Sequence, residues 1–220
     1  MKLIFAFVIA IFVQISQADE VDDKFRSSKI VEDLMPKSPE SLLDVEFDCG
    51  FVKLGNKFSP LQVRNRPKVT WKSTKENEFY SLIMTDAEGK GVEWLHWHVG
   101  NIQGNNIDKA DVLTAFFPST PPKNTGEHRY VFLLFKQPTK IDFNGHIIIP
   151  TFEMDGRNKF STKAFVEKFK LVTPVAGNFY LAAWDESCIE IDKLVEKNAR
   201  KNWTNSHAAL LNKNLSFVVR

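Results

Sequence analysis

The feature that most constrains the fold of this chain is a series of short strand-like segments separated by turn-forming residues. Leu42 to Phe51 alternates apolar and acidic side chains, which is the period of two expected for a half-buried strand. Tyr130 to Phe135 is continuously apolar, which indicates a central strand buried on both faces. The pattern predicts a mainly β, mostly antiparallel domain of the α+β class. Four further segments are strand-like as well: Phe79–Thr85, Trp94–Ile102, His146–Ile149 and Phe179–Trp184.

Helix signals appear only toward the C-terminus. Ser161 is a suitable N-cap for a helix that carries Phe165, Phe169 and Val172 along one face. Ile189 to Ala199 is a second helix candidate, with apolar side chains among charged ones. We therefore expect a few helices after the strands.

The N-terminus has the pattern of a secretory signal peptide. One lysine precedes an apolar run from Leu3 to Val13, and small residues lead to a cleavage site after Ala18. A transmembrane helix needs about 20 apolar residues, so this run is too short to be one. We expect a secreted, extracellular protein with no transmembrane segment. No repeat or linker divides the remainder, so the expected order is signal peptide 1–18, N-terminal arm 19–41, one domain 42–198 and tail 199–220.

Secretion changes what the cysteines and asparagines can do. Cys49 and Cys188 are the only cysteines, and in an oxidising compartment they could pair in a disulfide. The alternative is two buried free thiols, because the sequence does not show that the two residues are close. Asn202 and Asn214 begin N-x-Ser/Thr sequons in the C-terminal tail, so both are candidate N-glycosylation sites.

Charge and motifs exclude several functions. Lys and Arg outnumber Asp and Glu by only 29 to 27, and positive charge is not clustered, so we expect no nucleic-acid partner. The chain has no G-x-S-x-G, phosphate-loop, C-x-x-C or H-E-x-x-H motif, and we expect no cofactor. His96 and His98 stand two apart, so on a regular strand they would share one face, as metal ligands in some β barrels do. The alternative is that one of them bonds to the backbone and the other lines a surface.

Four collinear blocks of the sequence are similar to one known family. Glu93-Trp94-Leu95-His96 begins one block, and Gly126-Glu127-His128-Arg129-Tyr130 follows a Pro-Pro pair in another. Leu54 to Pro67 precedes these blocks and Pro174 to Asp185 follows them, in the same order. These blocks, spanning roughly Leu42 to Lys197, resemble the phosphatidylethanolamine-binding protein (PEBP) family, and the second contains its G-x-H-R-Y signature.

The resemblance implies two antiparallel sheets in Greek-key style, with C-terminal helices beside a small anion pocket. Imidazole N–H groups and a tyrosine hydroxyl would donate to phosphoryl oxygens, and an aspartate would orient a histidine or accept from an ethanolamine ammonium group. Because these residues include no nucleophile–base pair, binding is favoured over catalysis and we expect no enzyme. Carried over residue by residue, the ligand-binding positions are Asp86, His96, Pro121, Pro122, His128 and Tyr130.

The chain departs from the family pattern beside the pocket. The D-P-D-x-P loop of the family reads Asp86-Ala87-Glu88-Gly89-Lys90, and without its prolines we expect a more mobile loop. Thr120 replaces the glycine before the Pro-Pro rim, and Asp192 stands where some relatives carry an aromatic lid. Trp94-Leu95-His96-Trp97 also resembles the PEBP-like mitochondrial large-subunit ribosomal protein, which indicates kinship within the family and not a location.

Three hypotheses for the function follow. The first is a secreted, non-catalytic protein that binds a phospholipid head group or another small phosphoryl anion. The second is an interaction protein with a vestigial pocket, whose partner would be a protease or a signalling component. The third is a metal-dependent enzyme that uses His96, His98 and Asp86.

Overall fold

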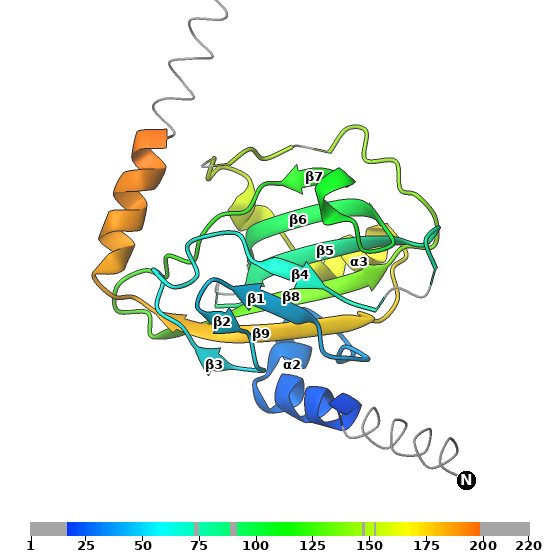
Figure 1. Ribbon diagram of the computed structural model, residues 1–220, viewed down its shortest axis with the longest axis horizontal. Helices are drawn as coiled ribbons and strands as arrows, with labels where there is room; N and C mark the ends of the chain where they lie inside the picture. The colour runs from blue at the N-terminus through cyan, green and yellow to red at the C-terminus, as the bar shows by residue number, and fades with distance from the viewer. Residues whose placement is uncertain (1–16, 73–74, 89–91, 147, 152, 199–220) are drawn as a thin grey trace, which may run out of the picture.

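Two β-sheets form the frame of the molecule, as the strand-like segments predict (Figure 1). The computed structural model describes residues 17–72, 75–88, 92–146, 148–151 and 153–198 of the 220-residue chain. The larger sheet has the strand order β3 (Asn56–Lys57), β9 (Ala176–Ala183), β8 (Glu127–Lys136), β5 (Phe79–Asp86), β6 (Trp94–Gln103) and β7 (Asp111–Thr114). The smaller sheet has the order β2 (Gly50–Phe51), β1 (Asp44–Phe47) and β4 (Lys68–Thr70).

Neighbouring strands run antiparallel except for β3 and β9, which are parallel. β8 lies in the middle of the larger sheet, between β9 and β5, and its residues from Tyr130 to Phe135 are all buried. The structure thereby confirms the prediction that this continuously apolar segment is a central strand. The mainly β fold of the α+β class is confirmed as well.

The main hydrophobic core lies between the two sheets. Alternate side chains of β1 point into it, and they meet the facing side chains of the larger sheet. This core explains the period of two in the β1 sequence, because one face of that strand is buried and the other meets solvent. Its fully or nearly fully buried members include Leu43, Val45, Phe47, Tyr80, Leu82, Met84, Trp97, Val99, Phe132 and Tyr180.

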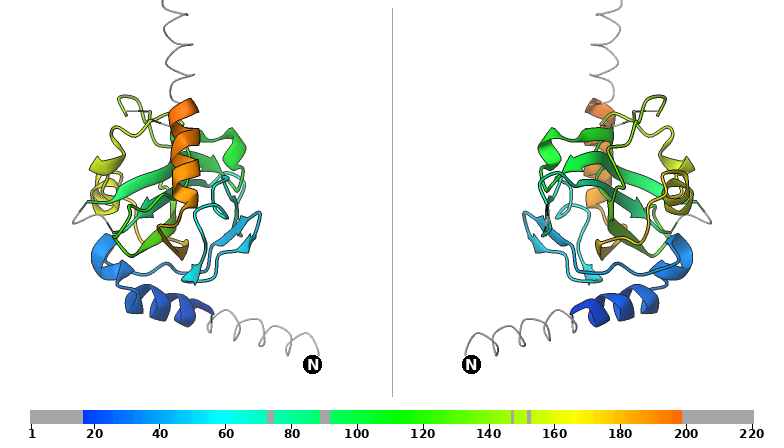
Figure 2. Two further views of the ribbon diagram at one scale, coloured as in Figure 1. Left: turned by 90° about the vertical axis from the view of Figure 1, so that its left-hand side faces the viewer. Right: turned by 90° about the vertical axis from the view of Figure 1, so that its right-hand side faces the viewer.

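A second core covers the other face of the larger sheet, where the helices pack. Figure 2 shows α3 (Thr162–Lys168) and the smaller sheet on opposite sides of the larger sheet. The segment expected to be an N-terminal arm belongs to this core: residues 17–27 are helical, α2 (Ile30–Leu34) follows, and Phe25 is fully buried against Phe179. Val21 and Phe25 are four residues apart, so they lie on one face of the helix, and both are fully buried. The many charged residues around them make this apolar face hard to recognise from the sequence.

Three details of the sequence reading are wrong. Among the described residues of His146–Ile149, only Ile149 pairs, in an isolated bridge with Thr114, so this segment is not a strand. The segment Leu42 to Phe51 is a hairpin of β1 and β2, because a turn at Asp48 and Cys49 folds it back. Ser161 does cap α3, accepting a hydrogen bond from the Ala164 N–H at 3.2 Å. However, α3 ends at Lys168, so Val172 lies beyond the helix and its side chain is 78% exposed.

Both cysteines are free thiols, so the disulfide that the sequence allows is not formed in this structure. Cys49 is exposed in the β1–β2 turn, whereas Cys188 is buried in the C-terminal helix, which covers residues 187–198 of the described chain. The two thiols therefore belong to separate elements of the fold.

Asn202 and Asn214 lie outside the described residues. Among the described helices, none is long and apolar enough to cross a membrane.

Candidate functional site

The sheet register brings the predicted pocket residues together. Asp86 is the last residue of β5, and it pairs with Tyr130 on β8 and with Trp94 on β6. His128 precedes Tyr130 by two positions on β8, so its side chain is on the same face. The His96 ring lies 5.1 Å from the Tyr130 ring, edge to face. Four of the six predicted residues thus form one cluster at the shared end of β5, β6 and β8.

His128 is held from both sides of its ring. Its Nδ1 lies 2.7 Å from Asp86 Oδ2, and because an ionised carboxylate only accepts, Nδ1 carries a hydrogen. Its Nε2 lies 2.6 Å from Thr125 Oγ1, which in turn lies 2.7 Å from the Pro122 carbonyl oxygen. When the Thr125 hydroxyl donates to Pro122, Nε2 must also donate, and the ring is then an imidazolium. The site can therefore hold a positive charge beside Asp86.

His96 has a different role from the one implied by the family resemblance. Its Nδ1 donates to the Phe117 carbonyl oxygen at 2.9 Å, which leaves Nε2 with a lone pair in the neutral ring. Burial lowers the pKa of His96 from 6.5 to about 4, although the nearby Asp86 carboxylate opposes the shift. At neutral pH this imidazole is consequently a hydrogen-bond acceptor, not a second N–H donor to an anion.

The Tyr130 hydroxyl is the unsatisfied polar group of the cluster. The Tyr130 ring is fully buried and stacks on Tyr180 at 5.1 Å, yet its oxygen has no hydrogen-bond partner among the described residues. The Tyr180 hydroxyl is hydrogen-bonded to Ser119. Burial raises the pKa of Tyr130 well above its usual value, and Asp86 raises it further, so the hydroxyl keeps its proton. Ser119 and Asp86 lie close enough to influence this pKa, but the hydroxyl makes no well-formed hydrogen bond to either of them.

The Pro-Pro turn is linked to the cluster through Thr125, whose hydroxyl lies near both the Pro122 carbonyl and His128 Nε2. Pro121 is buried and Pro122 is exposed. The next residue, Lys123, places its Nζ 4.4 Å from the centroid of the Trp184 ring, which fixes a positive charge near the rim. Sequence reasoning missed Lys123, Thr125 and Trp184 as site residues, although all three lie inside the blocks that carry the family resemblance.

The loop after Asp86 is anchored despite its missing prolines. The Glu88 N–H donates to Asp86 Oδ1 at 2.9 Å, and Glu88 Oε1 accepts from Arg129 Nε at 2.5 Å. Arg129 also pairs with Asp33 of α2 at 2.8 Å. The glutamate that replaces the family's second aspartate therefore ties the described part of the loop to β8 and to the N-terminal helices. Gly89 and Lys90 lie outside the described residues.

His96 and His98 do not share a face, and this prediction is wrong. A β-bulge interrupts the pairing of β5 with β6: Met84 pairs with Trp97, but Thr85 pairs with Leu95. The extra residue, His96, reverses the alternation. The His98 ring consequently points to the helix side of the sheet, 4.6 Å from the Phe165 ring. The proposed metal site of His96, His98 and Asp86 cannot form, and the described residues contain no other group of three His, Cys, Asp or Glu side chains suited to a metal ion.

Arg157 explains how the bulge is held, and sequence reasoning missed it. Its guanidinium is fully buried, with Nη1 donating to the carbonyl oxygens of Leu95 at 3.0 Å and His96 at 3.2 Å. Nη2 donates to the Ala115 and Pro150 carbonyls. A buried arginine that binds backbone carbonyls satisfies acceptors that an irregular strand leaves unpaired. Arg157 thus positions the backbone that carries His96.

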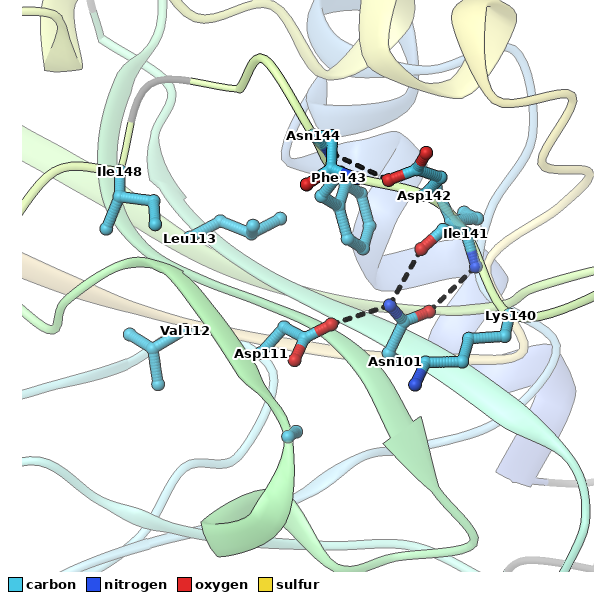
Figure 3. A pocket seen from close by; sticks show the side chains of 11 residues that line it. Asn101, Asp111, Val112, Leu113, Lys140, Ile141, Asp142, Phe143, Asn144 and Ile148 are labelled. Atoms are coloured by element: carbon cyan, nitrogen blue, oxygen red, sulfur yellow. Dashed lines mark hydrogen bonds between the residues drawn. The ribbon is translucent and has the colours of Figure 1, made fainter.

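A wide cavity of about 700 Å³ lies away from this cluster, between β7, residues 140–144 and Ile148 (Figure 3). The Asn101 side-chain amide lines this cavity. The Nδ2 atom donates to Asp111 Oδ2 and to the Ile141 carbonyl, and Oδ1 accepts from the Ile141 N–H and from Gln137. Because the hydrogen-bonding capacity of Asn101 is used internally, this amide offers nothing further to a ligand.

Comparisons with known proteins find related sequences over most of the domain. A sequence model described as "Phosphatidylethanolamine-binding protein" matches residues 38–180, which is more than half of the chain. A 26 kDa secreted antigen of Toxocara canis is 42% identical over 165 residues, covering 71% of this chain and 62% of that protein.

Solved structures show the same fold. A carboxypeptidase Y inhibitor, in complex with its cognate proteinase, aligns with a TM-score of 0.64 at 24% identity, over 76% of this chain and 97% of that chain. A phosphatidylethanolamine-binding protein from Plasmodium vivax aligns with a TM-score of 0.60 at 20% identity, over 75% of this chain and 98% of that chain.

Proposed function

This chain belongs to the phosphatidylethanolamine-binding protein family, and we propose that it is a secreted, non-catalytic protein that binds the phosphoryl head group of a phospholipid or another small phosphoryl anion. Its relatives by sequence and fold include a secreted antigen and an inhibitor, which supports a binding role. The proposed ligand contacts are Asp86, His96, His128 and Tyr130, with Pro121 and Pro122 at the rim.

The observation that carries this proposal is the buried Tyr130 hydroxyl, which has no hydrogen-bond partner in the described protein. A buried polar group without a partner costs about 1–3 kcal/mol, so an acceptor oxygen from a ligand would be stabilised there. The His128 ring can supply positive charge a short distance away, and Lys123 supplies it at the rim. The neutral His96 Nε2 would accept from an ammonium group or from a protonated phosphoryl oxygen. Together these groups match a phosphoryl head group.

Calorimetric titration with phosphorylethanolamine tests the site. His128→Ala should weaken binding by about 10- to 150-fold, the cost of losing a charge-assisted hydrogen bond. His98→Ala is the matched control, because that imidazole lies on the opposite face of β6 and should leave the affinity within about 2-fold. Equal losses from the two variants would refute this site, and so would an unchanged affinity in both.

The non-catalytic part of the proposal has its own test. Thr125, His128 and Asp86 lie in line like a hydroxyl–imidazole–carboxylate triad. However, the exposed Thr125 hydroxyl donates its one hydrogen to the Pro122 carbonyl, so it does not offer that hydrogen to His128 Nε2 as a nucleophile would. We expect no turnover of an activated ester above that of a Thr125→Val variant. Turnover by the wild type that this variant abolishes would show an enzyme instead.

Secretion is tested at the N-terminus. The proposed cleavage after Ala18 falls within helical residues 17–27, so the mature chain would keep Val21 and Phe25, which are both fully buried. N-terminal sequencing of the native protein should begin at Asp19. A native chain that begins at Met1 would contradict the signal peptide.

One observation favours the second candidate function, a protein partner such as a protease. The C-terminal helix packs Ile191 and Val195 against Phe117, but it leaves Ile189 46% and Leu194 52% exposed. A protein partner would cover these two apolar side chains. Inhibition of carboxypeptidase Y by the wild type, lost in an Ile189→Glu, Leu194→Glu variant that still binds phosphorylethanolamine, would support this function over head-group binding.

A further inference from the structure

A second cavity lies on the helix side of the larger sheet and uses none of the proposed head-group contacts. It has a volume of about 390 Å³, within the range of small-molecule sites in proteins. β6 contributes His98 to its wall, the segment before Ile149 contributes His146, and α3 contributes Ala164 and Phe165. The β-bulge that turns His96 toward the head-group cluster leaves His98 facing this cavity.

Two buried imidazole nitrogens in this cavity lack hydrogen-bond partners. The Nε2 atoms of His98 and His146 are both buried, and neither is bonded to another described residue. His98 is only 4% exposed. Buried polar atoms in folded proteins are normally satisfied, so two unsatisfied nitrogens on residues that line one cavity are consistent with a ligand that carries a polar group.

The charges around the cavity oppose a cation. Burial lowers the pKa of His98 to about 3 and also lowers that of His146, so both rings are neutral at physiological pH. The lining residues include Lys168 but neither aspartate nor glutamate. Lysine next to two neutral imidazoles, with no carboxylate, disfavours an amine or a metal cation and favours an uncharged or weakly acidic ligand.

The apolar part of the lining consists of Phe160 and Phe165 together with Leu95, Leu113 and Ile149. The His98 ring contacts the rings of Phe143, Phe160 and Phe165, with centroids 4.6–6.2 Å apart. Phe143 is not part of this lining, but its ring lies 5.5 Å from the His146 ring and close to Gly100, where a Cβ would stand 2.3 Å from it. Such walls suit a flat apolar ring, since aromatic pairs are favourable edge to face.

We propose that this cavity is a second ligand site, which binds a small phenol whose hydroxyl lies between His98 Nε2 and His146 Nε2. A hydroxyl can donate to one nitrogen and accept from the other, so one group satisfies both atoms in either complementary pair of tautomers. The ring of the phenol packs among the phenylalanines. The site is independent of the head-group cluster, because β6 separates the two.

Titration with 4-ethylphenol and with ethylbenzene, which lacks the hydroxyl, tests this site. Wild-type protein should bind the phenol about 10-fold or more tightly than the hydrocarbon, the value of one buried hydrogen bond. His98→Leu should abolish that preference, and His146→Leu should reduce it at a half-buried position where folding is less at risk. Ala164→Trp, on the exposed side of α3, should fill the cavity and block both ligands. His128→Ala should change none of these affinities.

Several results would overturn the proposal. These are an absence of phenol binding at millimolar concentrations, or a hydroxyl preference that survives both histidine variants. Stoichiometric zinc binding by the wild type that His98→Leu abolishes would assign the two histidines to a metal instead. Loss of phenol binding in His128→Ala would place the phenol in the head-group cluster.

Discussion

His96 and His98 are separated by one residue, yet the protein places them in two different environments. His96 is hydrogen-bonded to a backbone carbonyl beside Tyr130, whereas the His98 Nε2 is unbonded among phenylalanines. The difference comes from a single extra residue in β6 relative to β5. The alternation of side chains along a strand predicts their faces only while the strand pairing is regular. No residue near His96 indicates from the sequence that a bulge interrupts the pairing. The sequence therefore could not show that the two histidines face apart.

The burial of His98 predicts a pH-dependent cost to stability. Its pKa falls from 6.5 to about 3 on folding, so below pH 6.5 the unfolded chain binds a proton that the folded protein does not. Stability is then lost as pH falls from 6.5 toward 3. Relative to a His98→Leu variant, the wild type should lose on the order of 1.5 kcal/mol between pH 6.5 and 5, measured by urea unfolding. Parallel stability curves for the two proteins would contradict a buried neutral His98.

At the scale of the element, strands were easier to predict than the features that connect them. β5, β6, β8 and β9 follow from apolar runs, and α3 follows from its Ser161 cap. The tight turn at Cys49 does not follow from the sequence pattern. The two N-terminal helices do not follow from it either, because many charged residues surround their few apolar positions. Of the pocket, the family blocks gave Asp86, His96, His128 and Tyr130. The family blocks do not predict the contact between Thr125 Oγ1 and His128 Nε2, because that contact depends on how the turn before β8 folds.

At this scale we predict that Arg157 contributes strongly to stability. Replacing it with methionine should lower the free energy of unfolding by about 3 kcal/mol or more, because the carbonyls of Leu95, Ala115 and Pro150 lose the guanidinium donor, although the His96 carbonyl keeps the Phe117 N–H. Arg66→Met is the matched control, since the Arg66–Asp108 ion pair is exposed and should contribute less than about 1 kcal/mol. Similar urea midpoints for the two variants would mean that Arg157 does not hold the bulge.

At the scale of the whole molecule, the head-group cluster is linked to both ends of the described chain. Arg129, next to His128, joins the Glu88 loop to Asp33 of α2 and to the Ser28 carbonyl. On the other side, the C-terminal helix packs against Phe117, which accepts from His96. The site is thus supported by segments that precede and follow the strands in sequence, so the N-terminal helices are part of the domain and not an appended arm.

This organisation predicts a large cost for a substitution near the N-terminus. Phe25 is fully buried, edge to face with Phe179 at 5.4 Å, and a Cβ on Gly177 would lie only 3.0 Å from its ring. Phe25→Ala should lower the free energy of unfolding by about 3–5 kcal/mol, because it removes a large core side chain and leaves a cavity. Phe51→Ala, at a position 50% exposed in β2, should cost no more than about 1 kcal/mol. Chemical unfolding of both variants, made in the chain that begins at Asp19, measures the difference. If Phe25→Ala cost as little as Phe51→Ala, residues 19–35 would not be packed on the sheet, and the Arg129–Asp33 link to the head-group site would not exist in solution.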